Sequence, residues 1–258
     1  MALVKLAGFL LLLTLPALCL GTDSLKFLVL GDWGGLPTFP FHTSIERGVA
    51  KQMGRVKQQF GGEFVLALGD NFYFDGVKDV SDKRFKETYD YVFTADSLKN
   101  VPWYLVAGNH DHNGNVSAQI EYSKHESRWN FKDFYYLLQF PVPGGKNVDI
   151  VMIDTVLLCG NSDHDFKNQQ PVGPENQHLE ITRPGLKVNF FVIGAANFAD
   201  TSNKHKDDVP TGSSKFFWAN EKDAGGFAKV ELTSTNMTLT FVEGVGKELY
   251  QQVLYPRH

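Results

Sequence analysis

The chain has 258 residues, of which 43% are hydrophobic, 21% charged and 13% aromatic. This composition excludes a disordered or fibrous protein and allows one large domain or two small ones with a core of useful size. The formal net charge of -4 gives no reason to expect binding to nucleic acid or to an anionic membrane surface.

The first residues have the pattern of a secretory signal peptide. Lys5 supplies a positive charge, the apolar run 6–15 is too short to span a bilayer comfortably, and small residues follow up to Gly21. We therefore expect residues 1–21 to be removed and the mature chain, 22–258, to enter the secretory pathway without a stable membrane anchor. The alternative is that this segment stays in place as an anchor. Export agrees with two N-glycosylation sequons, at Asn115 and Asn236.

The cysteine count is odd once the signal peptide is removed. Cys19 lies in that peptide, so Cys159 is left without a partner in an oxidising compartment. An unpaired cysteine in an exported protein indicates a partner in another molecule, a buried free thiol, or a partner that is missing from the chain.

Apolar runs bounded by turn residues predict an α/β protein. In chain order we expect a strand at 26–30, a helix at 45–60, a strand at 63–68, a helix at 82–91 and strands at 101–107 and 149–153. The first helix has Thr43 or Ser44 as N-cap and ends at Gly61. Further strands at 188–193, 226–232 and 237–243 have no helices between them, and the polar stretch 161–187 has no clear strand or helix.

Three of the predicted strands end in glycine followed by a residue that can bind a metal: Asp32, Asp70 and Asn109. Sites in open α/β sheets form beyond the carboxyl ends of parallel strands, so these side chains should converge at one rim. Two neighbouring carboxylates repel unless a cation compensates them. Tyr73 could add a phenolate oxygen, a hard ligand that favours a trivalent metal such as ferric iron. Taken singly, Asp32 or Asp70 could instead be a helix N-cap or turn residue.

His110 directly follows Asn109. It could be a metal ligand, a loop residue, or an acid that protonates a leaving alkoxide, because histidine titrates in the useful pH range. Asp111 and His112 are candidates for loop residues that orient it.

The three strand ends read GDWG from Gly31, GDNFY from Gly69 and GNHD from Gly108. These blocks resemble the first three of the calcineurin-like metallophosphoesterases, and the tyrosine after GDN is the variant found in purple acid phosphatases. The stretches DWGGLP, LGDNFYFDGV, IDTVLLCGNSDHDF and GAANFAD are similar to the small, animal, tartrate-resistant type. The resemblance covers nearly the whole mature chain.

The resemblance implies a four-layer αββα sandwich and an acid phosphatase that hydrolyses phosphate monoesters, phosphoproteins included, with a metal-activated hydroxide. It implies a dinuclear site with Fe(III) and either Fe(II) or Zn(II). Asp32 and Tyr73 would bind the ferric ion, Asp70 would bridge both metals, Asn109 would bind the divalent ion and His110 would contact the phosphate or protonate the leaving group. It also implies a lysosomal or secreted enzyme, which we expect to be a monomer.

The chain departs from the family in its histidines. The resemblance implies two further blocks, Gly-His and Gly-His-x-His, which supply the remaining metal ligands. The candidates His125, His164, His178, His205 and His258 do not follow a glycine. We therefore expect a contiguous block of two strands with their helices, at least ~60 residues, to be absent near 170–180. In the family, the partner of Cys159 lies in that block.

Three functions remain open on these residues. The first is an active acid phosphatase of the purple type. The second is a catalytically impaired or inactive variant that acts, if at all, as a secreted binding protein. The third is a metallophosphoesterase with another phosphate substrate, such as a nucleotide or a phosphoprotein.

Overall fold

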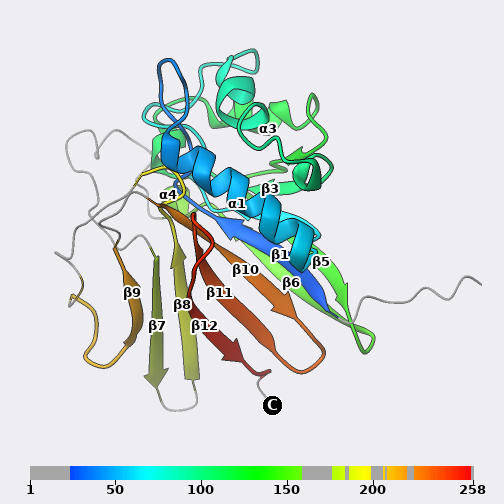
Figure 1. Cartoon of the computed structure of the whole chain (residues 1–258), viewed down its shortest axis with the longest axis vertical. Coiled ribbons are helices and arrows are strands. Elements are labelled where there is room, and N and C mark those ends of the chain that lie inside the picture. The colour runs from blue at the N-terminus through cyan, green and yellow to red at the C-terminus, as the bar shows by residue number, and fades with distance from the viewer. Residues whose placement is uncertain are drawn as a thin grey trace, which may run out of the picture.

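The computed structural model describes residues 24–158, 176–183, 186–198, 206, 208–219 and 224–256 (Figure 1). The predicted signal peptide, Cys159 and the histidines at 164, 205 and 258 lie outside these residues. Within the described part of the chain, no helix is both long and apolar enough to cross a membrane.

The N-terminal half alternates strands and helices as the sequence predicts. Its elements are β1 (Leu25–Leu30), α1 (Ser44–Phe60), β2 (Phe64–Ala67), η1 (Phe85–Asp90), η2 (Asp96–Leu98), β3 (Trp103–Leu105), α2 (Asn109–His112), α3 (Val116–Tyr122) and β4 (Trp129–Asn130). The Thr43 side chain caps α1 by accepting from the Glu46 N–H at 3.0 Å, and Gly61 ends it in the left-handed conformation. The predicted first helix is therefore confirmed, while the second is shorter than expected and is wound as a π-helix.

Among its described residues, the C-terminal half consists of strands and one short helix. Its elements are β5 (Tyr135–Val142), β6 (Lys146–Ile153), α4 (Thr155–Leu158), β7 (Asn176–Arg183), β8 (Leu186–Ile193), β9 (Ser214–Trp218), β10 (Gly226–Leu232), β11 (Met237–Glu243) and β12 (Glu248–Leu254). The expectation that 161–187 contains no strand is wrong for β7. Its polar sequence gives little strand signal, and backbone pairing with β8 and β9 holds it in the sheet.

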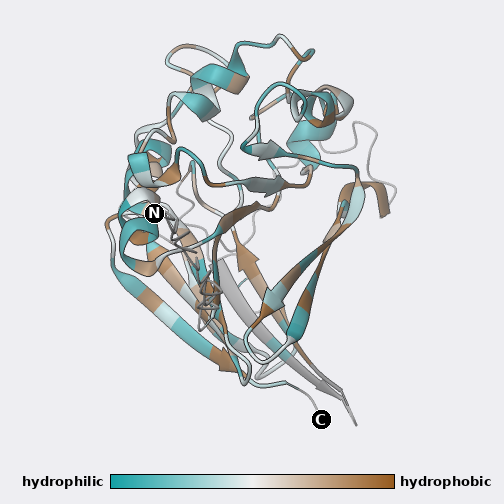
Figure 2. Ribbon diagram, turned by 90° about the vertical axis from the view of Figure 1, so that its right-hand side faces the viewer, coloured by the Kyte–Doolittle hydropathy of each residue, from teal (hydrophilic) through white to brown (hydrophobic). Residues whose placement is uncertain are grey.

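Seven strands form the central sheet, in the order β12-β11-β10-β1-β2-β3-β4. β1, β2, β3 and β4 run parallel, whereas β10 pairs antiparallel with β1. Parallel strands bring their carboxyl ends to one edge, so the loops after β1, β2 and β3 are neighbours. β1 and β2 are buried along nearly their whole length, as expected for strands covered on both faces, while Figure 2 shows hydrophobic and polar residues mixed along other strands.

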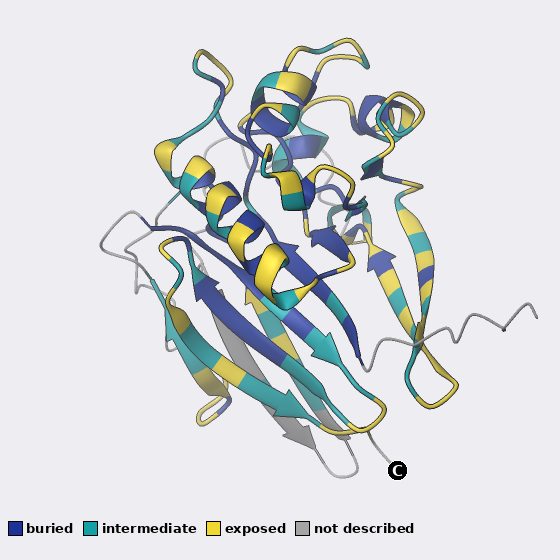
Figure 3. Cartoon of the chain, turned by 45° about the vertical axis from the view of Figure 1, so that its right-hand side comes forward, coloured by how far each residue is buried: buried dark blue, intermediate teal, exposed yellow. Residues whose placement is uncertain are grey.

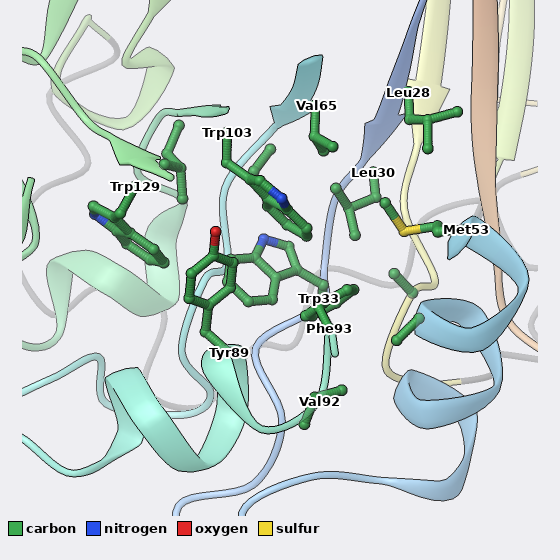
Figure 4. Close-up of a cluster of buried hydrophobic side chains, with 14 of the residues drawn as sticks. Leu28, Leu30, Trp33, Met53, Val65, Tyr89, Val92, Phe93, Trp103 and Trp129 are labelled. Carbon is green, nitrogen blue, oxygen red and sulfur yellow. The ribbon is translucent and has the colours of Figure 1, made fainter. Parts of the chain in front are cut away.

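The helices cover one face of this sheet over an aromatic core. Trp33, Tyr89, Phe93, Trp103 and Trp129 are buried there, and the rings of Trp33 and Trp103 lie 5.4 Å apart (Figure 4). Helix α1 turns its buried residues toward the sheet and its exposed residues toward solvent (Figure 3). The first two loops at the sheet edge therefore start from a rigid, densely packed layer.

The other face of the sheet packs against a second layer in two pieces, the hairpin β5–β6 and the three-stranded sheet β8-β7-β9. Leu138 and Met152 of the hairpin and Phe216 of β9 join the core formed with Phe64 and Phe241. This arrangement confirms the predicted α/β class, with helices on one face of a mixed sheet and strands on the other. On the outward face of the hairpin, Tyr135, Leu137, Val151 and Ile153 remain 43–61% exposed, which is consistent with an incomplete outer layer.

We predict that Trp103→Ala lowers the free energy of unfolding by about 3–5 kcal/mol, because a fully buried indole leaves a cavity among three aromatic neighbours. Urea unfolding followed by circular dichroism measures the change. Tyr255→Ala, at a ring that is 74% exposed, is the matched control and should change the free energy by less than about 0.5 kcal/mol. Equal effects of the two substitutions would contradict this description of the core.

Candidate active site

The structure brings the predicted site residues together at the edge where β1, β2 and β3 end. The Tyr73 hydroxyl donates to Asp32 Oδ1 at 2.8 Å, and the Asp32 N–H donates to the Gly69 carbonyl at 3.2 Å. The His110 N–H donates to Asp70 Oδ1 at 3.1 Å. Asn109 precedes His110 in the same turn and is half-buried at this rim.

Asp32 and Asp70 occupy the left-handed region of backbone space, with φ of 52° and 49°. Non-glycine residues are uncommon there, and such positions gather at functional sites where the surrounding structure holds them. Neither residue is the N-cap of α1, because Thr43 has that role. The alternative interpretation of Asp32 as a cap is therefore wrong, and its side chain is free to face the rim.

Two glycines allow the loops to approach each other this closely. A Cβ at Gly34 would lie 2.5 Å from the backbone nitrogen of Phe72, and one at Gly108 would lie 2.2 Å from Asp70 Oδ1. Neither space can hold a side chain. Glycine is therefore required at Gly34 and Gly108 by close packing and not by the backbone conformation of a turn.

The rim gathers acidic side chains where they are largely buried. Burial, and then the charges of Asp32 and Asp111, hold the pKa of Asp70 well above its usual range. Burial, and then the charges of Asp32 and Asp70, likewise raise the pKa of the Tyr73 phenol. Both shifts favour the protonated forms of these groups in the metal-free chain, and a cation among these oxygens would favour the ionised forms.

The donors at the rim are oxygens of two carboxylates and a phenol, with the amide of Asn109 beside them. Such hard donors suit a ferric or divalent ion. Within the described residues, no group of three or more His, Cys, Asp or Glu side chains gathers in a way that could hold a metal. The oxygen donors at the rim are therefore of the type that binds such cations. The described residues of the rim do not include the histidines that would complete the coordination of two metals.

Asp111 is a buried hub between the second and third loops. Its carboxylate accepts from the Asn71 and Phe72 N–H groups at 3.0 and 3.1 Å, from the Gly108 N–H at 2.9 Å and from Gln119 Nε2 at 2.8 Å. Burial raises its pKa, although these hydrogen bonds oppose the shift. Asp111 thus locks together the loops that carry Asp70 and Asn109, a role that the sequence does not reveal.

Arg84 makes a similar link between the first and second loops. Its guanidinium donates to the Gly34 carbonyl at 2.5 Å and to the Gly76 carbonyl at 3.2 Å. Burial lowers the pKa of Arg84 to about 10, which still leaves it charged at neutral pH. Its positive charge lies beneath loops that carry Asp32 and Tyr73.

A distant segment, 194–198, closes the rim. The Ala196 N–H donates to the Gly31 carbonyl at 3.3 Å, and Asn197 Nδ2 donates to the Gly35 carbonyl at 2.7 Å. The Phe198 ring packs 4.9 Å from that of Tyr73. This segment therefore buttresses the loop that carries Asp32 and the phenol that contacts it.

The sequence profile described as calcineurin-like phosphoesterase matches residues 25–209, most of the described fold and all of the rim residues up to Phe198. The chain belongs to the calcineurin-like phosphoesterase family. Within the family its relatives are acid phosphatases. It is 41% identical over 303 aligned positions to "Tartrate-resistant acid phosphatase type 5" of Oryctolagus cuniculus, which covers 92% of this chain and 92% of the relative.

Two further comparisons, one of sequence and one of structure, agree with membership of this family. "Purple acid phosphatase 7" of Arabidopsis thaliana is 43% identical over 108 residues, 42% of this chain and 31% of the relative. The solved structure titled "GAP50 the anchor in the inner membrane complex of Plasmodium" superposes with a TM-score of 0.70 at 18% identity, covering 92% of this chain and 90% of that one. The last comparison shows a shared fold. By family, then, the chain belongs among the acid phosphatases, which are phosphoric monoester hydrolases, and its family implies a metal cofactor.

The phosphoesterase blocks locate the rim residues but not their supports. Nothing in their spacing marks Arg84, Asn197 or Phe198, since each reaches the rim through tertiary contacts. Asp111 stands next to His110 in the third block, and its burial is the signal that separates it from a loop residue. The roles of Asp32, Asp70, Tyr73, Asn109 and His110 in binding and catalysis stay predictions.

We predict that Asp111→Ala lowers the free energy of unfolding by about 3 kcal/mol, because four buried donors lose their acceptor. Chemical denaturation at pH 7 measures the change. Glu121→Ala removes an exposed carboxylate from α3 and should change the free energy by less than about 0.5 kcal/mol. A loss from Asp111→Ala no larger than that of this control would rule out the hub.

We predict that Asp70→Asn makes the metal-free chain more stable at pH 7. The raised pKa of Asp70 means that its contribution is favourable below the unfolded pKa and is lost as the pH rises through the folded pKa. Asparagine removes that loss, so the free energy of unfolding should rise relative to the unmodified chain at pH 7, and the difference should vanish below the pKa of an unfolded aspartate. Asp79→Asn, at an exposed carboxyl whose pKa is lowered, should give no gain. An effect of Asp70→Asn on stability that does not change with pH would contradict the raised pKa of Asp70.

Proposed function

We propose that the rim is a site for hydrolysis of phosphate monoesters with a dinuclear centre of Fe(III) and either Fe(II) or Zn(II). The observation that carries the proposal is the hydrogen-bonded contact of Tyr73 with Asp32 next to the buried Asp70. A phenol among carboxylates favours a ferric ion over a purely divalent site. Membership of a family whose relatives are named acid phosphatases supports it.

Asp32 and Tyr73 would hold the ferric ion, Asp70 would lie between the two metals and Asn109 would bind the divalent ion. Such a metal pair supplies charge neutralisation of the phosphate and a hydroxide nucleophile. Around it, the chain's own residues keep Asp70 buried and hold its carboxylate through the His110 N–H.

His110 is the candidate proton donor to the leaving group. Its Nδ1 lies 2.8 Å from the Phe74 carbonyl, which can only accept, so Nδ1 carries the hydrogen. Nε2 is then the ring atom left to exchange a proton with a leaving group. The ring lies 4.7 Å from that of Tyr73, so this proton stands beside the rim.

We also propose that an internal segment is absent from this chain and that the site is therefore impaired. The alignment with the rabbit relative has 303 positions and includes 92% of 258 residues, about 237, so the relative alone fills about 65 positions. Two strands with their helices would have this length. Without the histidines expected in that segment, metal binding should be weak, because each lost ligand reduces affinity.

The remaining expectations belong to the same proposal. Substrates would be phosphomonoesters or phosphoproteins, and the chain would be monomeric, exported and lysosomal or secreted. Asn115 caps α3 through its Oδ1 and is exposed, and Asn236 lies in the turn between β10 and β11, so a glycan could be attached at either position. A secreted binding protein without catalysis is the second candidate, favoured by the outward apolar residues of the β5–β6 hairpin.

The test compares this chain with a chimera that carries the rabbit relative's additional positions where the alignment opens its gap. We expect the unmodified chain to retain clearly fewer than two metals and to hydrolyse para-nitrophenyl phosphate slowly at acidic pH. The chimera should bind two metals and gain activity. Elemental analysis and a phosphate-release assay measure both.

Tyr73→Phe in the chimera is the matched control for the ferric site. It should remove the visible phenolate-to-iron absorption band while leaving the second metal in place. A chimera without metal or activity would overturn the phosphatase site. Full metal content and activity in the unmodified chain would overturn the impairment.

A further inference from the structure

A buried hydrogen bond joins the third ligand loop to the second layer of the fold. His112 Nε2 lies 2.7 Å from Asp154 Oδ2, and the two side chains are 10% and 0% exposed. His112 is the last residue of α2, the turn that carries Asn109 and His110, whereas Asp154 follows β6. Neither residue belongs to the proposed ligand set.

Asp154 is fixed independently of His112. Its N–H donates to the Phe134 carbonyl at 3.1 Å, and its Oδ1 accepts from the Leu157 N–H at 3.0 Å. Oδ2 is therefore left for the imidazole. The His112 ring also stacks on Phe134, with centroids 6.3 Å apart, so two residues next to the hairpin hold it in one orientation.

The turn depends on outside support. Helix α2 has only four residues, which is far below the length that is stable alone. Asp111 holds its start through the Gly108 N–H at 2.9 Å, and the His112 N–H closes it on the Gly108 carbonyl at 3.3 Å. The side-chain bond of His112 to Asp154 fixes its other end.

We propose that Asp154 is a positioning residue that, through His112, holds Asn109 and His110 against Asp70. The proposal rests on the proposed function for what these two residues do, but the geometry itself can be tested in the metal-free chain. Hydrogen-bonding partners outside a ligand set commonly fix the orientation of the side chains that bind a metal.

The first measurement is hydrogen exchange in the metal-free, full chain. In Asp154→Asn, the amides of His110, His112 and Asn113, which are bonded within or beside the turn, should exchange about tenfold faster, because a charge-assisted bond is lost. Sheet amides such as those of Leu28 and Val65 should not change. Asp149→Asn removes an exposed carboxylate from β6, the strand that precedes Asp154, and should affect neither set.

The second measurement is the affinity of the full chain for Zn²⁺ by calorimetry. Asp154→Asn should weaken it about 10-fold to 100-fold, as loss of a supporting partner does. His112→Ala should do the same, and the double variant should be no weaker than either single one, because the two residues act as a unit. Thermal unfolding monitors global stability.

Equal acceleration of the turn and sheet amides would show a merely structural role and overturn the proposal. So would turn amides that exchange in Asp154→Asn as they do in the unmodified chain, or additive losses of zinc affinity in the double variant. If the unmodified chain takes up no zinc, as a severe form of the proposed impairment would give, hydrogen exchange alone decides whether Asp154 positions the turn.

Discussion

The Asp32 and Asp70 carboxyl groups and the Tyr73 phenol share one buried rim, and this crowding of oxygens is the constraint that organises the structure around it. Burial and mutual repulsion raise the pKa values of Asp70 and Tyr73, so ionisation of both groups is disfavoured unless a cation lies among their oxygens. The parallel pairing of β1, β2 and β3 brings the groups together, and two residues in left-handed conformation aim them. An arrangement that destabilises the empty fold points to a ligand that offsets it.

The supports of the rim come from every layer of the fold. Arg84 and Asp111 tie the loops to one another, Asn197 reaches from the segment after β8, and Asp154 anchors the third loop from the end of β6. The aromatic core beneath gives these contacts a rigid base. Such support explains how four-residue turns can hold side chains in fixed positions. Substitutions in the second layer should therefore change the positions of the rim loops.

The amino-acid sequence predicts the residues of the rim but not most of the residues that support them. The strand ends at Asp32, Asp70 and Asn109 were predictable, because a buried apolar run followed by glycine is a local signal. Helix α1 was predictable from its 3.6-residue pattern and its Thr43 and Gly61 boundaries. Strands β4, β5, β7, β9 and β12 are not predicted from the sequence. β7 is polar and β12 is an edge strand with glutamines, so backbone pairing and not side-chain pattern defines these two. Asp154 ended a predicted strand, but its contact with His112, 42 residues away in sequence, could not be read from either residue.

The most direct test is anomalous diffraction at the iron edge from crystals of the full mature chain soaked with ferric iron. The account predicts a peak within bonding distance of the Asp32, Asp70 and Tyr73 side-chain oxygens. Its occupancy should fall when Tyr73 is replaced by phenylalanine. Iron bound elsewhere, or crystals with these three side chains ordered around an iron-free rim at saturating iron, would contradict the claim that the oxygens gather to share a metal.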